Sequence, residues 1–144
     1  MQVAILAGGL AIRLKSLVRN TPKAMVEVWG RPFLEYQLDL LKKNNVRDIV
    51  LCLGHLGGAI EGYFGDGGEF GVEIKYSREG ERLLGTAGAL KNAEELLKEE
   101  FFVMYGDSYL FLDFQAAMSY FKGRNKLALM VVYKNYDQYD KSNV

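Results

Sequence analysis

Residues 2–9 read QVAILAGG, a short apolar run that ends at two glycines. Such a run predicts a buried strand that leads into a tight turn. Similar apolar runs occur at residues 48–53 (DIVLCL), 101–105 (FFVMY) and 127–133 (LALMVVY), and an alternating run, VEIKY, at 72–76. The sequence therefore predicts five strands, most of them apolar on both faces.

Helical patterns separate these strands. Residues 33–44 place Leu34, Leu38 and Leu41 along one face, with Gln37 between them. Strands that alternate with helices predict an α/β fold, a Rossmann-like, doubly wound and mainly parallel sheet with helices on both faces. We expect one domain over residues 1–144. Thr86 is expected to be the N-cap of a helix at residues 86–97. Helices are expected at residues 33–44, 59–64, 86–97 and 114–121.

Composition narrows the classes of protein. The chain has 144 residues, 49% of them hydrophobic, and 18 basic against 18 acidic side chains. Zero net charge argues against a general binder of nucleic acid or membranes. The lone Cys52 allows no disulfide within the chain, and no apolar run has the length of a signal peptide core or a membrane span, so we expect a cytoplasmic protein. An unpaired sheet edge would favour a homo-oligomer.

The glycine turn is followed by an unusual charge pattern. Residues 6–25 read LAGGLAIRLKSLVRNTPKAM and carry four cationic side chains but no acidic one. Gly8 and Gly9 allow backbone amides to approach an anion, and Arg13 and Lys23 can neutralise phosphate oxygens. The alternative is a structural turn beside a solvated basic face. No GK[ST] or GxGxxG motif follows, which argues against a kinase P-loop or an NAD-binding fingerprint.

Two other strand ends carry candidate ligands. Asp107 follows the apolar strand 101–105 and Gly106, a position that suits Mg²⁺, although an Asx-turn is the alternative. Asp113 is a second candidate ligand, but we expect it to cap the helix at 114–121. Glu79 precedes the GTAGAL segment, and its carboxylate can accept hydrogen bonds from N1–H and N2–H₂ of guanine. A solvated loop is the other interpretation of Glu79.

The first of these stretches resembles a known family signature. LAGGLAIRLKSLVRNTPKAM is similar to the LAGGxGxRLxPLTxxxPKxM signature of sugar-phosphate nucleotidylyltransferases, and RLLGTAGAL resembles their PLGTAGAL segment. The resemblance covers essentially the whole chain and is strongest to heptose- or hexose-1-phosphate guanylyltransferases. Two positions depart from the signature. Ala11 replaces a glycine, and Lys15-Ser16-Leu17 replaces the segment x-Pro-Leu.

The resemblance implies an activity and a set of site residues. It implies an enzyme that joins a nucleoside triphosphate to a sugar 1-phosphate and releases pyrophosphate, with Arg13 and Lys23 acting on the phosphates and Asp107 binding Mg²⁺. Because the family domain is longer, a nucleotide-binding module without transferase activity remains an alternative. A uridylyl- or thymidylyltransferase is another. The residues implied for nucleotide binding are Leu6, Ala7, Gly8, Gly9, Glu79, Gly85 and Thr86.

Overall fold

The computed structural model describes residues 1–9, 21–80, 83–136 and 138. Arg13 and Ala11 lie outside these described residues. The chain divides into two units, Met1–Phe111 and Leu112–Val144, and each is described by itself. The single domain over residues 1–144 stays a prediction.

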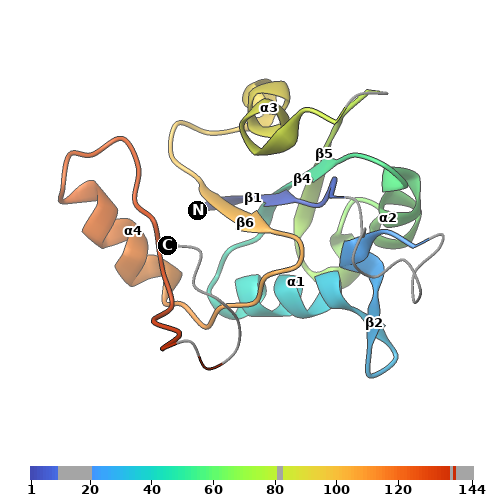
Figure 1. The fold of residues 1–144 in the computed structure, drawn as a ribbon, viewed down its shortest axis with the longest axis horizontal. Helices are drawn as coiled ribbons and strands as arrows, with labels where there is room; N and C mark the ends of the chain where they lie inside the picture. Colours follow the sequence, from blue (N-terminus) through green and yellow to red (C-terminus); the bar gives the residue numbers. More distant parts are fainter. Residues whose placement is uncertain (10–20, 81–82, 137, 139–144) are drawn as a thin grey trace. The chain divides into compact units, whose positions relative to one another are not determined.

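A four-stranded parallel sheet forms the centre of the first unit (Figure 1). Its order is β5-β4-β1-β6, so β1 pairs with β4 on one side and with β6 on the other. In such a sheet the crevice beyond the carboxyl ends of the two strands where the order reverses is the expected ligand site. The strands are β1 (Gln2–Leu6), β4 (Asp48–Leu53), β5 (Glu73–Arg78) and β6 (Phe102–Tyr105).

Helices cover both faces of this sheet. Figure 1 shows α1 (Phe33–Lys43) and α3 (Gly85–Asn92) on opposite faces. The helix α1 begins directly after Pro32, whose fixed φ suits the start of a helix. Helix α2 (Gly57–Phe64) follows β4 in the same unit. The predicted α/β class is confirmed, because the continuous apolar strands lie between two helical layers.

The core lies on both faces of β1 and β4. Val3, Ile5 and Leu51 have no exposed surface. On the α3 face, Val50 and Cys52 pack against Ala89 and Ala93. Because a residue and its neighbour in a strand point to opposite faces, these two central strands need apolar side chains at nearly every position.

Short elements complete the first unit. A small hairpin of β2 (Glu27–Val28) and β3 (Arg31–Pro32) precedes α1, and the sequence patterns did not indicate it. The segment at residues 65–71 contains a single turn of 3-10 helix, and Gly65, Gly67 and Gly71 in it have positive φ. The single-turn 3-10 helices are η2 (Lys23–Met25), η3 (Gly68–Phe70) and η4 (Glu94–Leu96).

Three expectations on secondary structure need correction. The helix expected at 86–97 ends at Asn92, and η4 follows it. The N-cap of α3 is Leu84 rather than Thr86, because the helix begins at Gly85, one residue earlier than expected. Residues 127–133 form no strand. A strand needs hydrogen bonds from a neighbour, and no described strand pairs with this segment.

The second unit contains one helix in its described part, α4 (Phe114–Lys122). Asp113 caps it, because its carboxylate accepts a hydrogen bond of 2.9 Å from the Ala116 amide. The capping role expected for Asp113 is confirmed. Within the described part of the chain, none of the helices combines the length and the apolar character that a bilayer crossing requires.

The burial of β4 predicts the cost of truncating its central leucine. Leu51→Ala should lower the free energy of unfolding by about 2–5 kcal/mol, because it leaves a cavity between two packed layers. Leu127→Ala is the matched control, since Leu127 is fully exposed and its loss should change stability by less than about 0.5 kcal/mol. Urea denaturation measures both. Equal losses would contradict the central position of β4.

Candidate functional site

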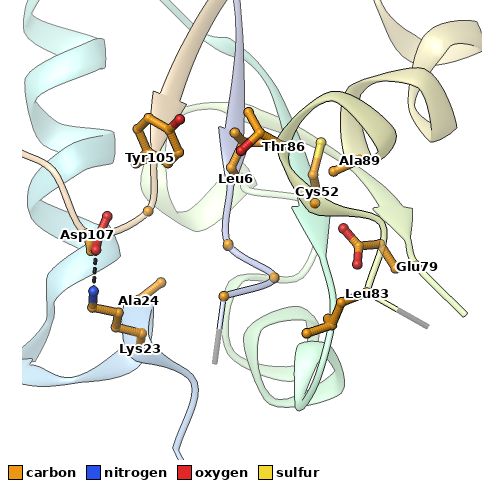
Figure 2. A pocket seen from close by; sticks show the side chains of 15 residues that line it. Leu6, Lys23, Ala24, Cys52, Glu79, Leu83, Thr86, Ala89, Tyr105 and Asp107 are labelled. Atoms are coloured by element: carbon orange, nitrogen blue, oxygen red, sulfur yellow. Dashed lines mark hydrogen bonds and ion pairs between the residues drawn. The ribbon is translucent and has the colours of Figure 1, made fainter. Parts of the chain in front are cut away.

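The carboxyl ends of the parallel strands surround a cavity of about 260 Å³ (Figure 2). It lies at the point in the sheet where the strand order reverses, between the segments that follow β1 and β6. Of the ten site residues that the family resemblance implies, all but Arg13 line it, and Arg13 lies outside the described residues. The nine are Leu6, Ala7, Gly8, Gly9, Lys23, Glu79, Gly85, Thr86 and Asp107.

The glycine turn after β1 lies directly against the end of β4. A Cβ atom on Gly8 would lie 3.0 Å from the Gly54 amide nitrogen, and one on Gly54 would lie 2.8 Å from the Gly8 carbonyl oxygen. Neither position therefore accepts a side chain without displacing the other segment. A Cβ atom on Gly9 would meet nothing within 4 Å, so this glycine leaves open space beside the cavity.

The end of β6 meets β1 in the same way. The Gly106 amide donates a 2.9 Å hydrogen bond to the Leu6 carbonyl, and a Cβ atom on Gly106 would lie 3.0 Å from that oxygen. The Ala7 amide donates to the Cys52 carbonyl at 2.9 Å. These backbone contacts hold three strand ends together at one edge of the cavity.

Two opposite charges lie at one end of the cavity. Lys23, in η2, forms an ion pair with Asp107, which follows β6 (Figure 2). Their side chains are 39% and 41% exposed, so the pair is accessible from solvent. The sequence suggested that each residue acts on a phosphate or a metal, and the structure brings the two into contact with each other.

Glu79 lies at the other end of the cavity. Its amide donates to the Leu53 carbonyl at 2.8 Å, which extends the pairing of β4 and β5 by one residue. Its Oε2 accepts a 3.0 Å hydrogen bond from the Leu84 amide, at the start of α3. Its Oε1 would lie 3.5 Å from a Cβ atom on Gly8. The carboxylate is therefore fixed between the glycine turn and α3.

The remaining wall is apolar. Figure 2 shows Cys52, Leu83 and Ala89 on the same side of the cavity as Glu79 and Thr86. Burial, with a smaller contribution from the charge of Glu79, raises the pKa of Cys52 to about 11, so its thiol stays protonated at neutral pH. Cys52 is thus a small buried hydrophobe within the apolar run of β4.

Several lining residues were not singled out from the sequence. Ala24, Leu83, Ala89 and Tyr105 line the cavity, and Gly54 shapes it through its contact with Gly8. Gly54 carried a usable signal, because it directly follows a predicted buried strand. The apolar residues carried no such signal, because in the sequence an apolar residue of a cavity wall looks the same as an apolar residue of the core.

The donor set limits the kind of metal site. The described residues contain no group of three or more His, Cys, Asp or Glu side chains that could hold a metal ion. Mg²⁺, however, commonly binds through one or two carboxylates together with the phosphates of its substrate. Asp107 fits that mode, because it presents an accessible carboxylate on the cavity wall.

The cavity thus has one end with ionic groups and another end that is apolar and carries one carboxylate. The first can take a phosphate chain, and the second can take a flat ring with N–H groups. The sequence profile described as Nucleotidyl transferase matches residues 2–142. The chain belongs to the nucleotidyl transferase family.

Curated relatives in this family are sugar-1-phosphate nucleotidyltransferases. The D-glycero-alpha-D-manno-heptose 1-phosphate guanylyltransferase of Campylobacter jejuni is 38% identical over 146 residues, which cover 100% of this chain and 63% of that protein. The UTP–glucose-1-phosphate uridylyltransferase of Synechocystis is 32% identical over 142 residues, 91% of this chain and 37% of that protein. The chain thus spans less than two thirds of either relative.

A solved structure shares the fold of this nucleotidyl transferase chain. HddC from Yersinia pseudotuberculosis, crystallised in complex with GMP-PN, superposes with a TM-score of 0.73 at 34% sequence identity. The match covers 83% of this chain and 53% of HddC. The resemblance to sugar-phosphate nucleotidylyltransferases inferred from the sequence is confirmed at the level of family and fold.

Gly54 lies against Gly8, whereas Gly58 has open space around it. Alanine at these two positions should therefore have opposite effects on stability. Gly54→Ala should lower the free energy of unfolding by about 1–3 kcal/mol, because the new methyl group overlaps the Gly8 carbonyl. Gly58→Ala, on an exposed helical position with no atom within 4 Å of its Cβ, should raise it by about 0.5–1 kcal/mol. Chemical denaturation measures both. A stabilising Gly54→Ala would contradict the close approach.

Proposed function

We propose that this chain carries the nucleotide-binding part of a sugar-1-phosphate nucleotidyltransferase. The substrates proposed are GTP and a heptose or hexose 1-phosphate, and the products are a GDP-sugar and pyrophosphate. The observation that carries the proposal is the convergence of nine predicted residues around one cavity at the reversal point of the sheet. We also propose a cytoplasmic location, a reducing compartment that suits the lone Cys52.

The shape and charge of the cavity support one orientation of the nucleotide. The phosphates would lie over Gly8 and Gly9, where missing side chains leave room for close approach. The base would lie against Cys52 and Ala89 on the apolar wall. The reverse orientation would place a triphosphate beside the Glu79 carboxylate, which repels it.

Guanine fits the carboxylate end better than uracil or thymine. Guanine presents two adjacent donors, N1–H and N2–H₂, and Glu79 presents an acceptor that the Leu84 amide already holds in place. A uracil ring has only one N–H donor on its pairing edge and flanks it with carbonyl oxygens, which a carboxylate repels. Glu79 therefore favours a guanylyltransferase.

Lys23 and Asp107 would exchange partners when the nucleotide binds. An exposed ion pair of this kind is worth about 0–1 kcal/mol, so a triphosphate can compete for the ammonium group. The exchange frees the Asp107 carboxylate for Mg²⁺, which it would share with phosphate oxygens. Bound there, Mg²⁺ supplies neutralisation of the charge on the triphosphate.

The reaction is a single in-line displacement. An oxygen of the sugar 1-phosphate forms a bond to the α-phosphorus, and the bond from that phosphorus to the bridging oxygen breaks. Pyrophosphate leaves with the electron pair. Lys23 would hold the phosphate oxygens in position and neutralise their charge, and Arg13 is proposed to stabilise the departing pyrophosphate. No proton needs to move to or from a side chain.

The direct test incubates the chain with Mg²⁺, one of GTP, UTP or dTTP, and one of several hexose and heptose 1-phosphates. Mass spectrometry then identifies the product. A GDP-sugar product would support the proposal. A UDP- or dTDP-sugar product would assign UTP or dTTP as the substrate in place of GTP. GTP binding without any product would make the chain a binding module. Absence of nucleotide binding would refute the proposal.

The position of Glu79 predicts a base-specific effect. Glu79→Gln should weaken GTP binding roughly 10- to 100-fold, because it removes a charged acceptor facing two N–H donors while its carbonyl can still accept from Leu84. Isothermal titration calorimetry compares GTP with UTP. Glu69→Gln, at an exposed position in η3, is the control and should change neither. An equal loss of affinity for GTP and UTP would show that Glu79 orders the loop and does not recognise the base.

A further inference from the structure

Helix α1 carries a buried polar side chain on its apolar face. Gln37 has no exposed surface, although Leu34, Leu38 and Leu41 beside it fill the same face with apolar groups. A buried amide costs free energy unless it forms hydrogen bonds, so a leucine would serve packing alone at least as well. The contacts of Gln37 must therefore account for its presence.

Both contacts of Gln37 fall on the turn that carries Asp107. Its Nε2 donates to the Tyr105 carbonyl at 2.8 Å and to the Ser108 carbonyl at 2.6 Å. The Ser108 amide donates to the same Tyr105 carbonyl at 3.1 Å, which closes a turn with Gly106 and Asp107 at its centre. One amide group thus ties the first and last residues of this turn to α1.

The other half of the ion pair is also attached to α1. Lys23 lies in η2, whose C-cap is Val26, and the Phe33 amide at the start of α1 donates to the Val26 carbonyl at 2.9 Å. The helix therefore holds the segment that carries Lys23 at its first residue and the turn that carries Asp107 at Gln37. The relative position of these two charges depends on one rigid element.

We propose that Gln37 is a positioning residue of the metal–nucleotide site. It fixes the 105–108 turn so that the Asp107 carboxylate faces the cavity, where it would hold Mg²⁺. The inference rests on the proposed function, because it takes Asp107 as the metal ligand. Gln37 itself touches neither metal nor nucleotide, since two backbone carbonyls separate it from the cavity.

The chain offers a control at the opposite, amino-terminal end of the strands. Gln2, at the start of β1, is 1% exposed and also binds backbone through its side chain. Its Nε2 donates to the Leu96 carbonyl at 3.1 Å and to Asp48 Oδ1 at 3.0 Å, and its Oε1 accepts from the Lys98 amide at 2.7 Å. Gln2→Leu and Gln37→Leu both remove a buried amide with two backbone partners. Only Gln37 is connected to the turn that holds Asp107.

The test measures metal affinity in the nucleotide complex. Mn²⁺ is titrated into the GTP-bound chain and followed by electron paramagnetic resonance, and GTP affinity is measured separately without metal. Gln37→Leu should weaken Mn²⁺ binding about tenfold, the scale of losses when a group that orients a ligand is removed, and leave metal-free GTP affinity within about twofold. Gln2→Leu should change neither. Asp107→Asn should weaken Mn²⁺ binding as well, and the double variant Gln37→Leu with Asp107→Asn should lose little more.

Two results separate failure of this inference from failure of the proposed function. Unchanged Mn²⁺ affinity in Gln37→Leu, with a loss in Asp107→Asn, would overturn the role of Gln37 and leave the metal site standing. No Mn²⁺ or GTP binding by the unaltered chain would overturn both. If Gln37→Leu does not fold, Gln37→Met provides a more adaptable apolar replacement.

A measurement on the unaltered chain gives an independent answer. The side-chain amide signals of Gln37 in a nuclear magnetic resonance spectrum should shift when Mg²⁺ is added to the GTP complex, because the turn bonded to them meets the metal. The signals of Gln2 should stay in place. Unchanged chemical shifts of the Gln37 signals would overturn the proposal.

Discussion

The three strand ends that frame the cavity touch one another through their backbones, and the site depends on this contact. Gly8 lies against Gly54, and Gly106 lies against the Leu6 carbonyl, so closely that no side chain fits at any of the three glycines without a shift. Larger residues would force the strand ends apart and widen the edge where the cavity forms. The glycines of this edge are thus required first by packing and then by the space they leave for a ligand. Packing does not require a glycine at Gly9, which only leaves space for a ligand.

Charged side chains lie at both ends of the cavity that this frame surrounds. The chain has no net charge, yet the cavity places one carboxylate, Glu79, at its apolar end and an ion pair, Lys23 with Asp107, at the other. The pair is accessible to solvent and can exchange partners, whereas Glu79 is held by a backbone amide. The end proposed for the base is therefore preorganised, and the end proposed for the phosphates can rearrange.

Much of the site was predictable because parallel strands end at one edge. Knowing that residues 2–6, 48–53 and 101–105 are apolar strands was enough to bring the segments after them together. The same pattern failed at 127–133, since an apolar run cannot reveal whether a neighbouring strand exists to pair with it. Thr86 was wrongly predicted as the N-cap of α3. The helix begins at Gly85 with a left-handed φ, which a glycine allows but does not require, so the sequence did not reveal this start. Strand order also lay beyond reach, because it depends on contacts between distant residues.

The polar residue within the apolar face of α1 was visible in the sequence, but its partners were not. Gln37 binds carbonyls 68 and 71 residues away, and only the folded chain brings them within reach. The proposed metal and phosphate contacts thus depend on long-range backbone hydrogen bonds as well as on the signature itself. This is why the signature alone identifies the family but does not explain how its charged groups are held.

A crystal structure of the chain with Mn²⁺ and a non-hydrolysable GTP analogue would test the central claim most directly. We expect the phosphates over Gly8 and Gly9, the guanine edge on Glu79, and the anomalous peak of Mn²⁺ beside Asp107. Lys23 should have moved from Asp107 to a phosphate oxygen. A nucleotide bound away from this edge of the sheet, or an intact pair of Lys23 and Asp107 beneath a bound triphosphate, would contradict the account.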